Sequence, residues 1–232
     1  MALGCLLAVS IALLSPTAED PVRLRTIPSP RDLSGSARVV VVDFGRGPAQ
    51  VAATRAMRSR AEAILKDFAN AARDTLRRMR GNRDMRRYDL YLSVRPTVSL
   101  NQSGRVSAYL EVYTFTGGAR LNRWFETFTF VADERGARAV TLGDLLLPGR
   151  KRDFLDWVLL PALNELKADR GASPASMVDD RALNSFVATR SALVWLFSPY
   201  AVGAYAEGAY VVKLPLEKLG GYVQRTHPLL QP

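Results

Sequence analysis

Cysteine and histidine are almost absent from this sequence of 232 residues, which has one of each. A single cysteine, Cys5, cannot build a disulfide framework, and the two residues together cannot supply the ligand cluster that a zinc site needs. The one histidine, His227, has no second imidazole or thiol to work with, so a His-dependent triad is excluded. We therefore expect no metal and no cofactor, and we expect His227 to be a solvated bystander.

The sequence also has no apolar run long enough for a stop-transfer helix. The N-terminal run spans residues 2–14, a length typical of the core of a secretory signal. Residues 1–18 are therefore interpreted as a signal-peptide-like segment, and residues 19–37, with three prolines, as an extended linker. No Lys or Arg precedes the run, so the cleavage site and the true start stay open. Lipidation at Cys5 is disfavoured because apolar residues follow it, and the sequence predicts an exported protein, periplasmic or extracellular.

Acidic residues are scarce in one part of the chain. Within a net charge of +10, residues 46–95 carry 13 basic and 5 acidic side chains, and most of the basic ones are arginine. Such a field attracts anionic polymers or membrane surfaces, although a solvated helix face has the same composition. We expect Arg73, Arg77 and Arg80 to contact an anionic surface. A nucleic-acid binder using this basic helix is an alternative, but no recognised nucleic-acid motif is present, so no specific nucleic acid is expected.

Hydrophobic periodicity predicts two helices and a first group of strands. Apolar side chains three or four residues apart predict a helix over residues 49–80, with one buried stripe that includes Ala53, Met57, Phe68 and Leu76. Alternation of polar and apolar residues predicts two strands, over residues 88–100 and 105–116, joined by a hairpin. A second helix is expected over residues 152–168, bent at Pro161 because proline cannot donate a backbone hydrogen bond.

Strands grouped in runs, with two separate helices, indicate an α+β fold. The expected architecture is a mainly antiparallel β-sheet packed against a long N-terminal helix and a second helix. Residues 38–232 are expected to form one domain, with a strand-helix-strand part over residues 38–100 and a C-terminal part over residues 101–232. Further strands are expected at residues 39–44, 122–132, 186–189, 193–197 and 210–214.

Paired carboxylates are the remaining route to catalysis, as in glycosidases, where two acids flank the scissile bond. Glu111 and Glu126 are expected on neighbouring strands, where both could face one side of the sheet, and Asp144 is a third candidate acid. Acids on exposed strand faces are common, and no spacing rule singles these out. An envelope hydrolase or deacetylase accessory is therefore kept as an alternative, while no catalytic residue is assigned.

Two glycine-containing loops are candidates for ligand binding. The first contains Gly117 and Gly118 but has no following Lys-Ser or Lys-Thr, so it is not a phosphate-binding loop. Both glycines are expected to serve geometry by supplying positive φ between two strands. The second loop spans residues 199–208. The candidate ligand-binding residues of the two loops are Arg120, Asn122, Arg123, Trp124, Tyr200, Tyr205 and Glu207.

Three motifs resemble a known family. They are YTFTGGA at residues 113–119, LGDLL at residues 142–146 and FSPYAVGAYAEG at residues 197–208. With the order of elements over residues 39–219, they resemble the C-terminal extracytoplasmic domain of RsiV-type anti-sigma factors. That domain of unknown function also occurs beside peptidoglycan deacetylase domains and alone in secreted bacterial proteins. The family usually has His after Gly-Gly-Ala, where this chain has Arg120, which puts a His-dependent function in doubt.

The resemblance implies a binding or sensing role at the cell envelope. In RsiV itself this region senses lysozyme, but typical lysozymes are strongly basic, and like-charge repulsion from a chain of net charge +10 disfavours that partner. A cell-envelope polymer or an anionic membrane surface suits the charge better. The sequence therefore predicts an exported, non-enzymatic domain that binds or senses an anionic envelope component.

Overall fold

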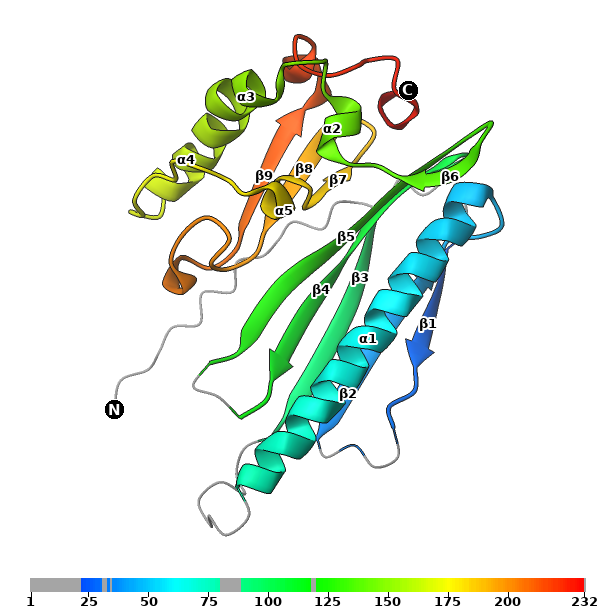
Figure 1. Ribbon diagram of the computed structural model, residues 1–232, viewed down its shortest axis with the longest axis vertical. Coiled ribbons are helices and arrows are strands. Elements are labelled where there is room, and N and C mark those ends of the chain that lie inside the picture. The colour runs from blue at the N-terminus through cyan, green and yellow to red at the C-terminus, as the bar shows by residue number, and fades with distance from the viewer. Residues whose placement is uncertain (1–21, 31–32, 34, 80–88, 118–119, 232) are drawn as a thin grey trace.

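The computed structural model describes residues 22–30, 33, 35–79, 89–117 and 120–231. The signal-peptide-like segment, Cys5, Arg80 and Gly118 lie outside the described residues. The described part has the α+β fold that the sequence predicted, with two β-sheets, one long helix and a second helical segment (Figure 1). No helix in these ranges is long and apolar enough to cross a membrane.

A six-stranded sheet in the order β1-β2-β3-β4-β5-β6 forms the centre. Its neighbours are antiparallel except β2 and β3, which are parallel and connected through the long helix α1 (Pro48–Arg78). The parallel pair explains the helix, because parallel neighbours need a long crossover whereas antiparallel ones need only a hairpin. The strands are β1 (Arg23–Ile27), β2 (Ser36–Asp43), β3 (Tyr91–Gln102), β4 (Arg105–Phe115), β5 (Asn122–Asp133) and β6 (Gly136–Ala139).

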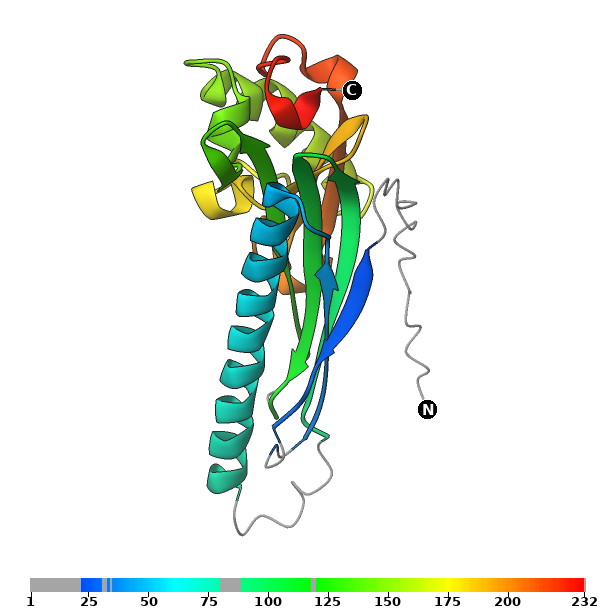
Figure 2. The same cartoon turned by 90° about the vertical axis from the view of Figure 1, so that its right-hand side faces the viewer.

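A second, three-stranded antiparallel sheet lies near one end of the first (Figures 1 and 2). It consists of β7 (Phe186–Ala188), β8 (Ala192–Phe197) and β9 (Tyr210–Pro215), and the sequence did not predict that these strands form a separate sheet. The remaining elements are α2 (Leu142–Leu145), α3 (Lys151–Phe154), the π-helix η2 (Leu155–Leu159), α4 (Leu160–Ala168), α5 (Asp180–Leu183) and the 3-10 helices η3 (Tyr205–Glu207), η4 (Leu216–Leu219) and η5 (Pro228–Leu230).

The two sheets and the helices form successive layers. One face of the large sheet packs against α1, through strand residues such as Leu110 and Val112 and helix residues such as Met57. The opposite face carries Tyr109 and Phe125, which pack against the small sheet. The far side of the small sheet packs against α2, α3 and α4 in the largest apolar cluster. Neighbouring strand residues therefore contribute to different cores, as the alternation of side chains along a strand requires.

The helix α1 matches the predicted span, but its buried stripe differs near the C-terminal end. Ala53, Met57 and Phe68 are buried as expected, whereas Leu76 is 41% exposed. Thr75 is buried instead, and its hydroxyl donates to the carbonyl of Thr116 at 2.8 Å. The tertiary contact with the loop after β4 thus decides which side of the last turn faces the protein.

Two local expectations are corrected. Residues 19–37 were expected to be a linker, yet within them β1 pairs antiparallel with β2, and β2 begins at Ser36. Pairing at the sheet edge gives the backbone N–H and C=O groups of β1 hydrogen-bond partners in β2, whereas those of a solvated linker would bond to water. The second helical segment was expected to bend at Pro161, but its irregularity is the π-helix over Leu155–Leu159, just before that proline. Proline cannot donate to the preceding turn, so the hydrogen-bond pattern changes there.

Candidate functional site

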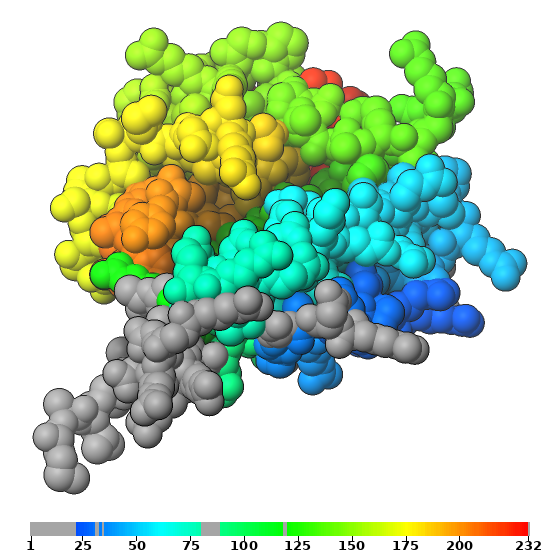
Figure 3. All heavy atoms as spheres, turned by 60° about the horizontal axis from the view of Figure 1, so that its bottom comes forward, coloured from blue at the N-terminus to red at the C-terminus, as the bar shows by residue number. Residues whose placement is uncertain are grey.

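A cavity of about 720 Å³ lies between α1, the start of β5 and the segment after β8. Figure 3 shows a hollow between the cyan surface of α1 and the yellow and orange surface formed near residues 180 and 200. Its volume falls in the range typical of small-ligand sites. The polar and aromatic residues that line it include Arg60, Asp67, Thr114, Asn122, Arg123, Trp124, Asp179, Arg181, Ser185, Ser198, Tyr200 and Tyr205.

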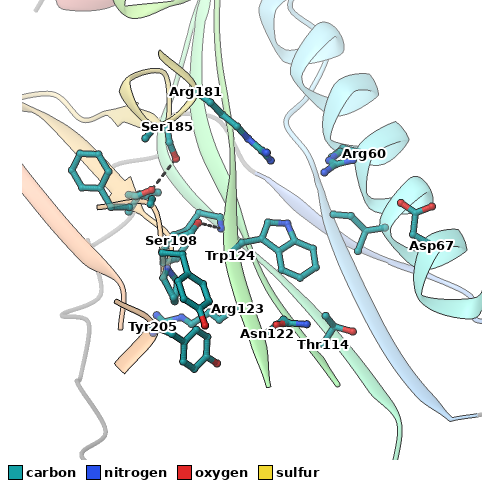
Figure 4. A pocket seen from close by; sticks show the side chains of 18 of the residues that line it. Arg60, Asp67, Thr114, Asn122, Arg123, Trp124, Arg181, Ser185, Ser198 and Tyr205 are labelled. Atoms are coloured by element: carbon teal, nitrogen blue, oxygen red, sulfur yellow. Dashed lines mark hydrogen bonds between the residues drawn. The ribbon is translucent and has the colours of Figure 1, made fainter. Parts of the chain in front are cut away.

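The wall formed by α1 and β5 is cross-linked through one carboxylate. Arg60 from α1 donates to Glu126 of β5 at 2.5 Å, and the indole N–H of Trp124 donates to the same oxygen at 2.9 Å. The hydrogen bond to Glu126 raises the pKa of Arg60, so this guanidinium is charged throughout the accessible pH range. Figure 4 shows Trp124 projecting from the strand toward α1. The aromatic face is therefore held in a fixed position beside the cavity.

A second ion pair lies on the other face of β4 and β5. Arg123 donates to Glu111 through Nε at 2.9 Å, and the Tyr113 hydroxyl donates to the same oxygen at 2.7 Å. Burial, with that hydrogen bond, raises the pKa of Tyr113 to about 12. The Arg123 guanidinium also lies 5.3 Å from the ring centres of Tyr113 and Phe125. These contacts fix Arg123 where the strand enters the cavity.

The strand register separates the two candidate catalytic carboxylates. Glu126 lies opposite Leu110, a residue of the α1-facing core, whereas Glu111 lies opposite Phe125, which faces the small sheet. Directly opposite residues share a face and successive residues alternate, so Glu111 and Glu126 lie on opposite faces. The arrangement in which both carboxylates face one side of the sheet is therefore excluded. The alternation of side chains was visible in the sequence, but the register between β4 and β5 was not.

The third candidate acid, Asp144, has a structural position. Its side chain accepts from the backbone N–H and the hydroxyl of Thr141, each at 2.7 Å, and so forms the capping box of α2. These bonds and the nearby Arg138 guanidinium lower the pKa of Asp144, despite partial burial. A carboxylate committed to capping a helix start is stabilised in its charged form and lies outside the cavity lining.

The two glycine-containing loops meet at the rim of the cavity. The Tyr205 hydroxyl donates to the carbonyl of Leu121, and the Arg120 guanidinium lies 5.4 Å from the centre of the Tyr205 ring. Tyr200 is 68% exposed and adopts φ 72°, and its ring centre lies 5.2 Å from that of Tyr205. A bulky residue at positive φ is strained, and such strain concentrates at functional sites. The rim therefore presents two neighbouring aromatic rings, tilted by 40° against each other, beside a guanidinium.

Glu207 does not line the cavity but anchors the loop behind it. Its carboxylate accepts from the ammonium of Lys167, from the Tyr210 hydroxyl at 2.9 Å and from the Ala204 N–H at 2.8 Å. Lys167 is 1% exposed and also donates to the Val202 carbonyl at 2.9 Å. Led by the hydrogen bond from Lys167, these contacts hold the pKa of Glu207 at about 2. The candidate ligand contact is thus a support for the loop that carries Tyr200.

Gly117 lies where α1 approaches the first loop. Its φ is 87°, and a Cβ at this position would come within 2.9 Å of both Thr75 Cγ2 and Met79 Cε. Positive φ and close packing both favour glycine here. This is the geometric role expected from the sequence, and Gly118 lies outside the described residues.

The cavity collects five of the seven candidate ligand-binding residues, namely Asn122, Arg123, Trp124, Tyr200 and Tyr205. Arg120 reaches its rim through Tyr205, and Glu207 lies behind it. The lining residues Arg60, Asp67, Asp179 and Arg181 were not among the candidates predicted from the sequence. Arg60 and Asp67 lie on a helix whose apolar and charged positions were visible, but nothing local indicated that α5 would pack opposite them.

The arginines expected at an anionic surface lie on the last turns of α1. Arg73 and Arg77 are exposed, and Arg80 lies outside the described residues. Arg77 lies 3.7 Å from Asp74, and Arg73 donates to the Asn70 amide oxygen at 3.0 Å. Neither lines the cavity. Surface contact by these residues stays a prediction separate from the cavity.

His227 is buried and does not behave as a solvated bystander. It is 7% exposed, caps η5 by accepting from the Leu229 N–H at 3.2 Å, and lies 3.2 Å from the Arg138 guanidinium. Burial and this guanidinium lower its pKa, which keeps the imidazole neutral. The structure places it away from the cavity, in a capping role. Among the described residues, no group of three or more His, Cys, Asp or Glu side chains could hold a metal ion.

Comparisons with known proteins identify the same fold. Residues 144–217 match a family described as a protein of unknown function, DUF3298. A crystal structure of a DUF3298 family protein from Pseudomonas aeruginosa PAO1 is 18% identical, with a TM-score of 0.63, and the match covers 92% of this chain and 98% of that one. A DUF3298 member from Bacteroides fragilis NCTC 9343 is 15% identical, with a TM-score of 0.54, and the match covers 88% and 94% of the two chains.

No curated protein sequence matches the chain. The two structural likenesses establish a shared fold, and the family match covers the part of the chain that holds α3, α4 and the small sheet. Residues 144–217 of this chain are therefore similar to the DUF3298 family, within a fold similar to that of solved DUF3298 proteins.

Proposed function

We propose that this protein is an exported, non-enzymatic domain that binds an anionic component of the cell envelope in the cavity between α1, β5 and the loop after β8. The finer resemblance to the RsiV-type extracytoplasmic domain is part of this proposal. The observation that carries it is the convergence of side chains from three distant segments on one cavity. Convergent polar and aromatic groups in a preformed cavity are the usual basis of ligand recognition.

Arginine supplies the charge for this role. Arg60 and Arg123 are held by Glu126 and Glu111, whereas Arg181, at the start of α5, is exposed and forms no ion pair within the described ranges. A guanidinium of this kind is available for a carboxylate or phosphate on the ligand. The strained, exposed Tyr200 offers an aromatic face to the same ligand.

A hydrolytic role finds less support in the geometry. Glu111 and Glu126 lie on opposite faces of the sheet, and each accepts hydrogen bonds from arginine. Two acids that flank a glycosidic bond must share one cleft, with carboxyl groups about 5–10 Å apart. The geometry therefore favours a binding role, in which the carboxylates of Glu111 and Glu126 hold the two arginines that line the cavity.

The test compares two charge reversals that change the net charge by the same amount. Arg181→Glu places a negative charge in the cavity, and Arg55→Glu does so on an exposed part of α1 that does not line it. Binding of the full chain to purified wall teichoic acid and to peptidoglycan sacculi is measured at two salt concentrations. We expect Arg181→Glu and Tyr200→Ala each to weaken binding at least tenfold, and Arg55→Glu to weaken it less than threefold. Equal losses in the two charge reversals would show a diffuse charge effect and refute the cavity as the site.

A further inference from the structure

The cavity lies at an open edge of the large sheet. Asn122, Arg123, Trp124 and Phe125 all line it, although successive strand residues point to opposite faces. Four consecutive residues can line one cavity only if it wraps around the strand edge. The pairing agrees with this, because within the described residues β5 pairs with β6 only from Phe130 to Asp133.

Backbone groups of β5 point into this edge. The N–H of Phe125 donates to the Ser198 hydroxyl at 3.1 Å, and the carbonyl of Thr129 accepts from the N–H of Val140 at 2.9 Å. Both groups point away from β4, and backbone orientation repeats every second residue, so the N–H and C=O of Arg123 also point into the cavity. Within the described ranges, neither group of Arg123 nor the carbonyl of Phe125 has a hydrogen-bond partner.

We propose that the part of the ligand which enters this cavity is an extended peptide main chain, added as a strand to β5. The inference rests on the part of the proposed function that makes this cavity the ligand site, and it names the class of ligand for that site. An extended peptide supplies alternating N–H and C=O groups at the spacing that an open strand edge requires. The Ser198 hydroxyl already occupies the position of one such acceptor against the Phe125 N–H. Side chains on either side of the added strand would meet α1 and the Tyr200 loop.

The walls of the groove suit a peptide better than a smooth apolar chain. Ile64 and Phe68 of α1 lie on one side and Leu196 and Pro199 on the other, with Arg181 and Asp67 among the lining residues. Apolar walls take up alternate side chains, and the two charges allow a peptide with side chains or termini of both signs. The main chain supplies the affinity and the walls supply the selectivity.

The first experiment selects binders from a phage-displayed library of random heptapeptides with the full chain as bait. The tightest peptide is synthesised with a single N-methyl group at each position in turn, and its affinity is measured by calorimetry. We expect N-methylation to weaken binding at least tenfold at every second residue and less than threefold at the residues between, because only alternate N–H groups face β5. A uniform profile, or a library that yields no enriched peptide, would overturn the inference.

A pair of variants locates the peptide. Arg123→Pro removes a backbone N–H that points away from β4, whereas Arg123→Ala removes the same ion pair with Glu111 and keeps the N–H. We expect the selected peptide to bind at least tenfold more weakly to the proline variant than to the alanine variant. Equal affinities in two variants with native circular dichroism would refute main-chain pairing at this edge. If the proline variant does not fold, the N-methyl profile decides alone.

Three further outcomes separate the proposals. A chain that forms dimers in light scattering, and becomes monomeric on Arg123→Pro, would show that a second copy occupies the edge and overturn the peptide assignment. Polymer binding that distinguishes Arg181→Glu from Arg55→Glu without any selected peptide would leave the proposed function standing and sink this inference. Peptide binding with the alternating profile but without polymer binding would support this inference and refute an anionic polymer as the ligand.

Discussion

Replacing Gly117 by alanine tests how tightly α1 is packed against the loop that leads into the site. Two costs arise. The first is the positive φ of 87°, which disfavours an L-residue by roughly 1–2 kcal/mol and is partly offset by about 0.4–1 kcal/mol from the smaller entropy of the unfolded chain. The second is steric, because the new Cβ would lie 2.9 Å from both Thr75 Cγ2 and Met79 Cε.

The steric cost depends on which neighbour can move. Met79 Cε is the end of a flexible side chain and can shift. Thr75 is β-branched, and its hydroxyl is held by the Thr116 carbonyl at 2.8 Å. Overpacking of this kind costs about 1–3 kcal/mol. The total for Gly117→Ala is therefore about 1–5 kcal/mol, which lowers the melting temperature by roughly 2–4 °C per kcal/mol for a chain of this size.

Gly149→Ala is the matched control, because its φ is 75° and its added Cβ would meet nothing within 4 Å. The free energy of unfolding is measured in urea for both variants by tryptophan fluorescence. We expect Gly117→Ala to be less stable than Gly149→Ala by at least about 1 kcal/mol, the lower limit of the overpacking cost. The double variant with Thr75→Ser, compared with that serine variant alone, should recover part of the loss, since serine keeps the hydroxyl and lacks Cγ2. Variants of equal stability would refute the packing argument.

Three other predictions follow from the structure. The Glu207 carboxylate has a pKa of about 2, below its usual 4.5. The stability that it contributes is therefore present above pH 4.5 and is lost as the pH falls through 2. Glu207→Gln should lower the melting temperature at pH 7, and the melting temperature of this variant should fall less steeply than that of the native protein between pH 5 and 2. Trp195→Ala should cost about 3–5 kcal/mol in urea unfolding, because the buried indole packs between Phe154 and Phe186 and donates to a backbone carbonyl; a cost below about 1 kcal/mol would contradict this. Reversal of the α1 arginines Arg73, Arg77 and Arg80 to glutamate should reduce retention on anionic vesicles severalfold at low salt, and unchanged retention would dismiss the surface role.

The elements with strong local patterns were predictable. The repeat of apolar residues three and four apart gave α1 within two residues at each end, and strict alternation gave β3 and β4. The tertiary contacts that bury a residue outside these patterns were not predictable. Thr75 replaces Leu76 in the buried stripe only because a loop carbonyl, that of Thr116, lies within its reach. His227 is buried only because the C-terminal turn packs against Arg138.

For the candidate site, the sequence identified the loops and the tertiary structure identified the cavity. Arg123, Trp124, Tyr200 and Tyr205 stood out as donors and aromatic faces beside glycines, and all four line the cavity. Arg181 had no local signal, because its place depends on how α5 packs across from α1.

The sequence by itself determined the α+β class, the long helix, the mainly antiparallel pairing and the glycine that turns the first loop, since each depends on residues near one another in the chain. The tertiary structure alone decided the division into two sheets, the register that separates Glu111 from Glu126, and the open edge of β5. These features depend on which distant segments pair, and a shift of one residue in register would move every side chain of a strand to the other face. Local pattern carries no information about that choice.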